Sequence, residues 1–140
     1  DFADPKDLVK NVESARVISK ELNMKIKIRP HINEDGIKNP EYLINEKLAD
    51  LKNIQGLGGI KNGLDSSRKQ QCEFTVFNLD AFESIKPEMV QNKLNGIYKL
   101  YGDKFSGQQM IFIYSGKAVK ATWKEVKTGK VTELLKELQE

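Results

Sequence analysis

Residues 38–53 read KNPEYLINEKLADLKN, and this stretch predicts the centre of the fold. The pair Asn39-Pro40 is a turn signal, and two short apolar runs follow it, Tyr42-Leu43-Ile44 and Leu48-Ala49. Because the polar residues 45–47 separate the two runs, we expect a tight β-hairpin here.

Three charged side chains lie at the rim of this hairpin. Glu41 precedes the first strand, and Asp50 and Lys52 lie on the second. Alternate residues of a strand point the same way, so Asp50 and Lys52 share a face. The residues fit the loose pattern P-(D/E)-x(n)-(D/E)-x-K, in which two carboxylates hold a divalent metal and the lysine stabilises phosphate charge. The same charges could equally form a solvated strand face.

The periodicity of the flanking segments predicts an α+β fold. A glycine-rich connector follows the hairpin over residues 53–65, with a helix starting near Leu64 or Asp65. The remaining expected helices cover residues 5–22, 87–101 and 130–139, and the remaining strands cover 24–28, 73–79, 110–114 and 118–123. The order α-β-β-β-α-β-α-β-β-α indicates a single domain over residues 1–140, with helices packed against a central, mostly antiparallel sheet.

Composition narrows the class of protein. The chain has 140 residues, which suits one domain, and it begins at Asp1, as expected of a domain excised from a longer protein. No apolar run approaches the ~20 residues that span a bilayer, so we expect no membrane contact. The net charge of +3 is a mild basic bias, compatible with binding to nucleic acid.

The lone Cys72 excludes a disulfide framework. It is expected to be a buried thiol, and the alternative is a nucleophilic Cys–His pair with His31.

Several residues outside the hairpin are candidates for binding or catalysis. His31 is the sole histidine and lies in the polar loop before the hairpin, where an imidazole could transfer a proton near neutral pH. The glycine-rich segment 55–60 lacks the pattern of a standard phosphate loop and favours a mobile connector, but the helix start that follows it could bind phosphate. The side chains expected to contact substrate are Lys38, Lys61, Ser67, Lys69 and Thr122.

The hairpin residues, together with Arg68, Gln70-Gln71 and the strand from Phe74 to Leu79, resemble the C-terminal nuclease domains of bacterial polymorphic toxins. These include contact-dependent growth-inhibition toxins and domains of phage head-morphogenesis proteins, and they are grouped with the barnase/EndoU/colicin/RelE-like ribonucleases. Such sequences typically read K-N-P-D-x-x-I-D-G-x-x-x-D-x-K. This chain departs from that pattern at Glu41 and at Asn45-Glu46, where Asp-Gly is usual, which puts the turn geometry in question.

The resemblance implies a toxin ribonuclease that cleaves tRNA without a metal cofactor. The ribose 2′-OH would attack the adjacent phosphate, with His31 as acid or base and Lys52 and Arg68 stabilising charge. Asp50 would orient Lys52 or His31, and Gln71 would hold substrate. The implied partners are tRNA or another RNA, a cognate immunity protein and a translation factor of the target cell. The toxin would be delivered from the producing bacterium and act in the target-cell cytoplasm.

Two alternatives remain open at the level of sequence. The first is a metal-dependent PD-(D/E)xK-type nuclease acting on DNA or RNA, in which Glu41 and Asp50 bind Mg²⁺, with Glu13 or Glu21 contributing. The second is a non-enzymatic binding or immunity module, in which the charged side chains of the hairpin would be solvent-exposed and have no role in function.

Overall fold

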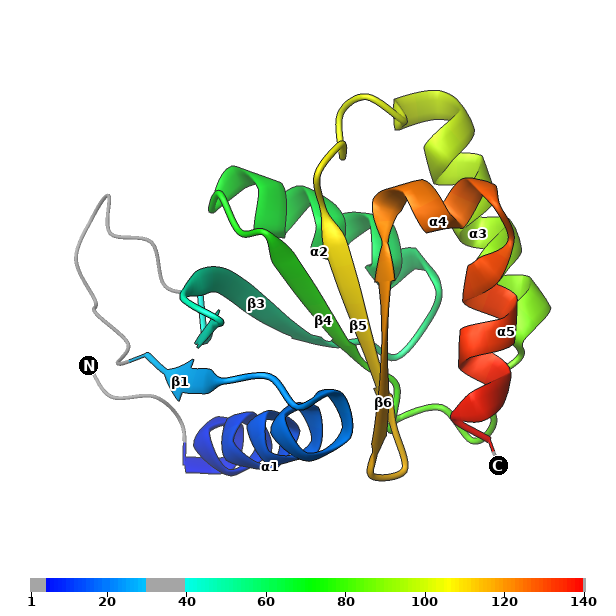
Figure 1. The fold of residues 1–140 in the computed structure, drawn as a ribbon. Coiled ribbons are helices and arrows are strands. Elements are labelled where there is room, and N and C mark those ends of the chain that lie inside the picture. Colours follow the sequence, from blue (N-terminus) through cyan, green and yellow to red (C-terminus); the bar gives the residue numbers. More distant parts are fainter. Residues whose placement is uncertain (1–4, 30–39, 140) are drawn as a thin grey trace.

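The computed structural model describes residues 5–29 and 40–139, and its centre is a six-stranded sheet with strands in chain order (Figure 1). The strands are β1 (Ile26–Ile28), β2 (Tyr42–Ile44), β3 (Lys47–Asn53), β4 (Phe74–Asn78), β5 (Gln109–Tyr114) and β6 (Lys117–Thr122). The helices are α1 (Pro5–Leu22), α2 (Gly58–Lys69), α3 (Pro87–Tyr101), α4 (Trp123–Lys127) and α5 (Lys130–Glu137). The predicted α+β class and the order of its strands are confirmed.

The sheet is mostly antiparallel, as the sequence predicted. Antiparallel pairing joins β1 to β2, β2 to β3 and β5 to β6, whereas β4 runs parallel to both β3 and β5. Parallel neighbours need a crossover, and α2 and α3 supply the two crossovers here. The four residues Phe74–Phe77 of β4 are all buried, which explains their continuous run without polar alternation.

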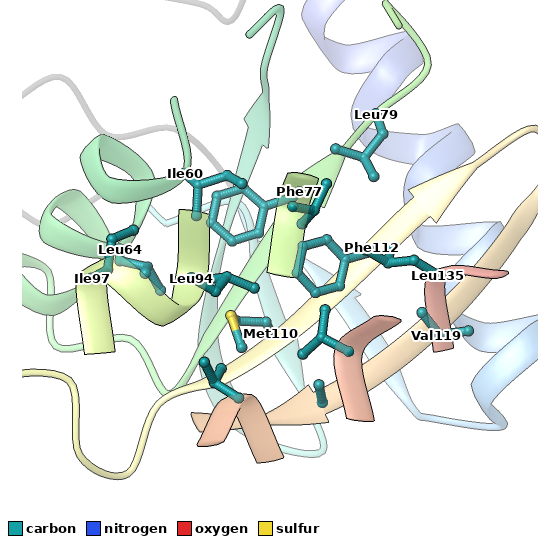
Figure 2. Close-up of a cluster of buried hydrophobic side chains, with 14 of the residues drawn as sticks. Ile60, Leu64, Phe77, Leu79, Leu94, Ile97, Met110, Phe112, Val119 and Leu135 are labelled. Carbon is teal, nitrogen blue, oxygen red and sulfur yellow. The ribbon is translucent and has the colours of Figure 1, made fainter. Parts of the chain in front are cut away.

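Helices cover both faces of the sheet (Figure 1). On one face α1 packs through Ala15 and Ile18 over a cluster of hydrophobic side chains from β2 to β6. On the other face α2, α3, α4 and α5 enclose the larger cluster, part of which is drawn in Figure 2. Phe77 and Phe112 lie at its centre, with ring centroids 5.6 Å apart. Along β3, Ala49 and Leu51 therefore face α1, and the alternate residues Asp50 and Lys52 face α2.

The hairpin of β2 and β3 closes through a two-residue turn. Ile44 pairs with Lys47, and the residues between them both have positive φ, 47° at Asn45 and 69° at Glu46. This is the conformation of a type I′ turn, which suits the twist of the strands. Asn45 is also fixed from outside the turn, because its side-chain oxygen accepts a 3.0 Å hydrogen bond from the Lys25 amide. The hairpin therefore forms despite the unfavourable glutamate.

The prediction for the glycine-rich segment is wrong at its helix boundary. Helix α2 begins at Gly58, not near Leu64 or Asp65, so Asp65 lies inside the helix and does not cap it. A Cβ on Gly59 would lie 2.7 Å from Ile54, and a Cβ on Gly63 would lie 2.7 Å from the Phe77 ring and 3.1 Å from Lys52. These glycines permit close packing of helix on sheet, and that tertiary requirement overrides their poor helix propensity.

The end of the sixth strand also differs from the prediction. Trp123 was assigned to the strand but begins the short helix α4. The backbone N–H of Thr122 donates to the Glu125 carboxylate at 2.9 Å, which satisfies a donor at the start of this helix. Trp123 is buried, and its indole N–H donates to the Gly102 carbonyl at 2.9 Å. Within residues 5–29 and 40–139, none of the helices has the length and hydrophobicity needed to span a bilayer.

Candidate active site

The hairpin register brings Glu41 and Asp50 together. Tyr42 pairs with Ala49, so the next position outward along the ladder places Glu41 beside Asp50. The Glu41 carboxylate accepts a hydrogen bond of 3.3 Å from the backbone N–H of Leu51, which holds it against the second strand. The predicted meeting of two acids at the end of the hairpin is therefore confirmed.

Asp50 is buried beneath α2 and is held by three donors. Its side chain is 3% exposed, and its Oδ2 atom lies 2.9 Å from Lys52 Nζ, 3.0 Å from Gln70 Nε2 and 3.5 Å from Ser66 Oγ. A buried carboxylate needs such partners because it has lost its water. Asp50 and Lys52 do share a face, as predicted, but the interpretation of a merely solvated strand face does not hold for the buried Asp50.

Glu41 titrates far from the usual range of a carboxyl group. Its pKa is raised to about 8, first because burial disfavours the charged form, then because of its hydrogen bond with Asp50 and the Asp50 charge. Near neutral pH Glu41 therefore carries a proton, which it shares with the neighbouring Asp50. Such a pair can exchange a proton with a substrate, or release it when a cation binds.

Helix α2 positions the donors to Asp50. The close approach at Gly63 seats the helix on Phe77 and on the stem of Lys52. Ser66 and Gln70 are one helical turn apart, so both face the same side, and the Gln70 amide also donates to Ser66 Oγ at 3.2 Å. Lys52 runs beneath the helix and keeps about a third of its side chain exposed. A phosphate can therefore approach its ammonium group while Asp50 stays buried.

The predicted catalytic residues are only partly brought together. Asp50 and Lys52 meet, whereas Arg68 is exposed on α2 and donates through Nε to the Lys104 carbonyl at 3.2 Å. Gln71 is exposed just beyond the helix with φ of 60°. His31 lies outside the described residues, and so does Lys38, which was predicted to bind substrate.

The other predicted substrate contacts are dispersed. Ser67 is fully buried against the core, so its hydroxyl cannot reach a substrate, and that prediction is wrong. Lys61 and Lys69 both lie on α2, the first in a 2.7 Å ion pair with Asp65 and the second exposed. Thr122 lies on β6, three strands from Asp50, which at strand spacing is about 14 Å.

Two carboxylates form the whole acidic set of the site in the described part of the chain. No group of three or more His, Cys, Asp or Glu side chains there could hold a metal ion. Glu13 and Glu21, considered as further ligands, are exposed on α1, which covers the opposite face of the sheet. Paired hard oxygen donors next to the partly exposed Lys52 nevertheless fit Mg²⁺, which commonly takes one or two carboxylates and fills its remaining positions with water and phosphate.

Ser66 and Gln70 were missed as site residues by the sequence analysis. A signal was available, because residues four apart on a helix share a face and both are polar. It could be used only once the helix was known to lie over β3, because the predicted helix from Leu64 or Asp65 already includes both residues. The packing of α2 on the sheet, which spacing along the sequence does not specify, is thus the reason for the omission.

Cys72 is a buried thiol, as predicted. Its pKa is raised to about 12, first by burial and then by the charges of Asp50 and Glu41. A thiol with so high a pKa is not a thiolate at neutral pH. Burial and the raised pKa of Cys72 therefore disfavour the alternative of a cysteine nucleophile, and the partner in that alternative, His31, lies outside the described residues.

Comparison with known proteins identifies the family. The family model described as the contact-dependent growth inhibition CdiA C-terminal domain matches residues 38–118, which include β2 to β5 and the cluster of Glu41, Asp50, Lys52, Ser66 and Gln70. A solved structure entitled CdiA-CT/CdiI toxin and immunity complex from Burkholderia pseudomallei is similar in fold, with a TM-score of 0.60. It is 18% identical over 84% of this chain and 85% of its own. No curated protein matches. The chain belongs to the family of CdiA C-terminal domains of contact-dependent growth inhibition.

Proposed function

We propose that this CdiA C-terminal toxin domain is a nuclease that cleaves RNA, with tRNA as the substrate and Glu41, Asp50 and Lys52 as its catalytic centre. The observation that carries the proposal is the carboxyl pair beside the Lys52 ammonium, which lies 2.9 Å from Asp50 and remains accessible. Two acids and a lysine suit phosphodiester cleavage, the acids as metal ligands or proton carriers and the lysine as a partner of the phosphate charge. The net charge of +3 and the three cations of α2, Lys61, Arg68 and Lys69, support a polyanionic substrate.

Each side chain has a distinct role in this proposal. Glu41 and Asp50 would hold Mg²⁺, which when bound supplies Lewis-acid chemistry at a phosphate oxygen. Lys52 would bind the phosphate and stabilise the negative charge that grows on it. Gln70 and Ser66 are positioning residues, since they touch Asp50 and not the substrate. Loss of such supporting bonds typically costs 10–100-fold in activity, so we expect Gln70→Ala to fall in that range.

A metal-free route at the same site is the second candidate, and one observation favours it. The pKa of Glu41, about 8, is matched to proton transfer near neutral pH. Glu41 with Asp50 would then take the proton of the ribose 2′-OH as its oxygen attacks the adjacent phosphate. The bond from phosphorus to the 5′-oxygen breaks, the carboxyl pair returns the proton to that oxygen, and the products are a 2′,3′-cyclic phosphate and a 5′-OH end. In this route Lys52 again stabilises the charge on the phosphate oxygens.

The test is cleavage of purified tRNA and of duplex DNA, each with Mg²⁺ and with EDTA. We expect cleavage of tRNA that needs Mg²⁺, and losses of at least 100-fold in Asp50→Asn and Lys52→Ala. Full activity of both variants would contradict the site. Cleavage in EDTA that leaves cyclic phosphate ends would establish the metal-free route, and cleavage of DNA alone would overturn RNA as substrate.

The pH profile separates the two routes independently. Mg²⁺ must displace the proton of the carboxyl pair, so metal-dependent activity should rise as pH increases from 6 to about 8.5. A metal-free reaction that needs both protonation states of the pair should instead give a bell-shaped profile. Glu41→Gln removes the carboxyl group that titrates, so its activity should show neither pH profile, and this variant serves as the control.

We also propose that a cognate immunity protein binds the domain and blocks cleavage, and that the domain acts in the cytoplasm of a target cell after delivery. A toxin and immunity complex of the same fold supports the first point. An immunity protein should protect tRNA at one-to-one stoichiometry. Comparing purified tRNA with tRNA in a cell extract tests whether a translation factor is also required.

A further inference from the structure

An exposed aromatic ring lies among lysines at the carboxyl end of α3. Tyr101 is 37% exposed and the neighbouring Leu100 is 73% exposed, so both side chains are accessible from solvent. The ammonium groups of Lys61 and Lys104 lie 4.8 and 5.4 Å from the centre of the Tyr101 ring. We call these four residues, Lys61, Leu100, Tyr101 and Lys104, the Tyr101 surface.

The lysines of the Tyr101 surface are held in place by one acid. Asp65 lies 2.7 Å from Lys61 and 2.9 Å from Lys104, so it fixes both ammonium groups beside the ring. The hydrogen bond to Asp65 raises the pKa of Lys61, which therefore stays charged. One carboxylate between two ammonium groups leaves a net positive charge. The geometry is thus prepared for an anion before any ligand arrives.

Two shallow hollows flank the ring. One, of about 310 Å³, lies between α2 and α3 and is lined by Lys61, Lys93 and Leu100 among others. The other, of about 440 Å³, lies over the end of α3 and is lined by Lys99, Tyr101 and Lys104 among others. Both hollows have lysines at their margins and Tyr101 in common. Their size and openness suit flat, solvated groups carried on a flexible chain.

Helix α2 connects the Tyr101 surface with the catalytic centre. Lys61, Asp65 and Arg68 recur at helical spacing on one side, and Ser66 and Gln70 point to the other side, toward Asp50. Between these two sides the outer face of the helix is solvent-exposed, with Asn62 and Lys69 on it. From Lys61 to Gln70 the helix advances only about 14 Å. A substrate strand can therefore contact both sites at once.

We infer that the Tyr101 surface binds an unpaired strand of the nucleic-acid substrate outside the cleavage position. A base stacks on the Tyr101 ring away from the two ammonium groups, and Lys61 and Lys104 bind phosphates of the same strand beside it. Stacking on an exposed aromatic ring inside a cationic groove is how proteins hold single strands without reading sequence. The inference rests on the proposed nuclease function and adds to it the part of the substrate that is recognised.

The experiment measures binding in the Asp50→Asn background, so that it does not depend on cleavage. The probe is a fluorescein-labelled, unstructured 12-nucleotide RNA, and a duplex of the same length is the comparison. We expect Tyr101→Ala to weaken single-strand binding at least fivefold, because stacking contributes about 1–3 kcal/mol per base. Tyr101→Phe keeps the ring and should bind within twofold of the parent. Lys20→Ala, exposed on α1 across the sheet, is the matched control and should also stay within twofold.

Each other outcome overturns the inference. Unchanged affinity of Tyr101→Ala for the single strand would overturn it. If the melting temperature of that variant also fell, the role of Tyr101 would be only to pack α2 against α3. An equal loss for the single strand and the duplex would exclude stacking on an unpaired base. The proposed function fails separately, when the unmodified domain cleaves neither tRNA nor DNA, and that result does not alter the binding comparison.

Discussion

Glu41 gives the clearest prediction at the scale of the residue. Its pKa is about 8 in the folded protein against an ordinary 4.5, so between these values the folded state binds more protons than the unfolded state. Stability must therefore fall as pH rises from about 5 to 8 and level off above 8. In Glu41→Gln this slope should disappear. Thermal melting at pH 5, 6.5 and 8 without divalent cations measures it.

The control for this titration is an acid outside the site. Glu137 is exposed on α5, and Glu137→Gln should keep the slope of the unmodified protein. A Glu41→Gln variant that still loses stability between pH 5 and 8 would show that another group is responsible.

Individual site residues differed in how far the sequence could predict them. Glu41, Asp50 and Lys52 are set by a hairpin register that adjacent residues determine, so they could be found from the pattern alone. Their burial could not be found, because it depends on α2, which follows them in the chain. The Gln70 contact depends on how the end of α2 is rotated over β3, and sequence spacing does not specify that rotation.

At the scale of the element, the turn of the β2–β3 hairpin is a site of strain that can be relieved. Glu46 has φ of 69°, a left-handed conformation that costs a residue with a Cβ about 1–2 kcal/mol. Glu46→Gly should therefore stabilise the protein by about 1 kcal/mol in urea unfolding. Asn45→Ala should act in the opposite direction, since it keeps the strained φ and loses the bond to the Lys25 amide. Equal effects of the two changes would contradict a type I′ turn.

Helix α2 and helix α3 offer a matched pair of glycines. A Cβ at Gly63 would meet the Phe77 ring at 2.7 Å and force α2 away from Lys52, whereas a Cβ at Gly96 would meet nothing within 4 Å. Gly63→Ala should destabilise the protein by about 1–3 kcal/mol and lower nuclease activity. Gly96→Ala should stabilise it by up to about 1 kcal/mol and leave activity unchanged. Chemical unfolding with a parallel cleavage assay tests both.

The elements also show where periodicity stops being informative. The helices over residues 5–22 and 87–101 were predicted with their observed bounds, because each has a long amphipathic pattern and a proline at its start. The start of α2 was misplaced because glycines are typical of loops in a sequence, whereas here they let the helix pack closely against the sheet. Helix α4 was missed because its five residues are too few to show a period.

At the scale of the whole molecule, the matched segment is smaller than the folding unit. Residues 38–118 exclude α1 on one face and α4 and α5 on the other. The excluded helices bury Ile18, Val131 and Leu135 completely, and each such side chain contributes about 1.5–3 kcal/mol. Because total stabilities are about 5–15 kcal/mol, a fragment of residues 38–118 should be unfolded. Circular dichroism beside the full chain measures this, and a cooperative melt of the fragment would contradict it.

All groups of the catalytic centre lie within thirty consecutive residues, from Glu41 to Gln70. Contacts within this proposed centre therefore join residues that are close in the sequence, whereas the fold around it includes a parallel strand pairing between residues as far apart as Phe74 and Gln109. One short hairpin and one helix, both formed by neighbouring residues, need only dock to assemble it. The rest of the fold contributes no group to the centre, yet the hairpin and the helix keep their docked geometry only when the surrounding strands and helices are in place.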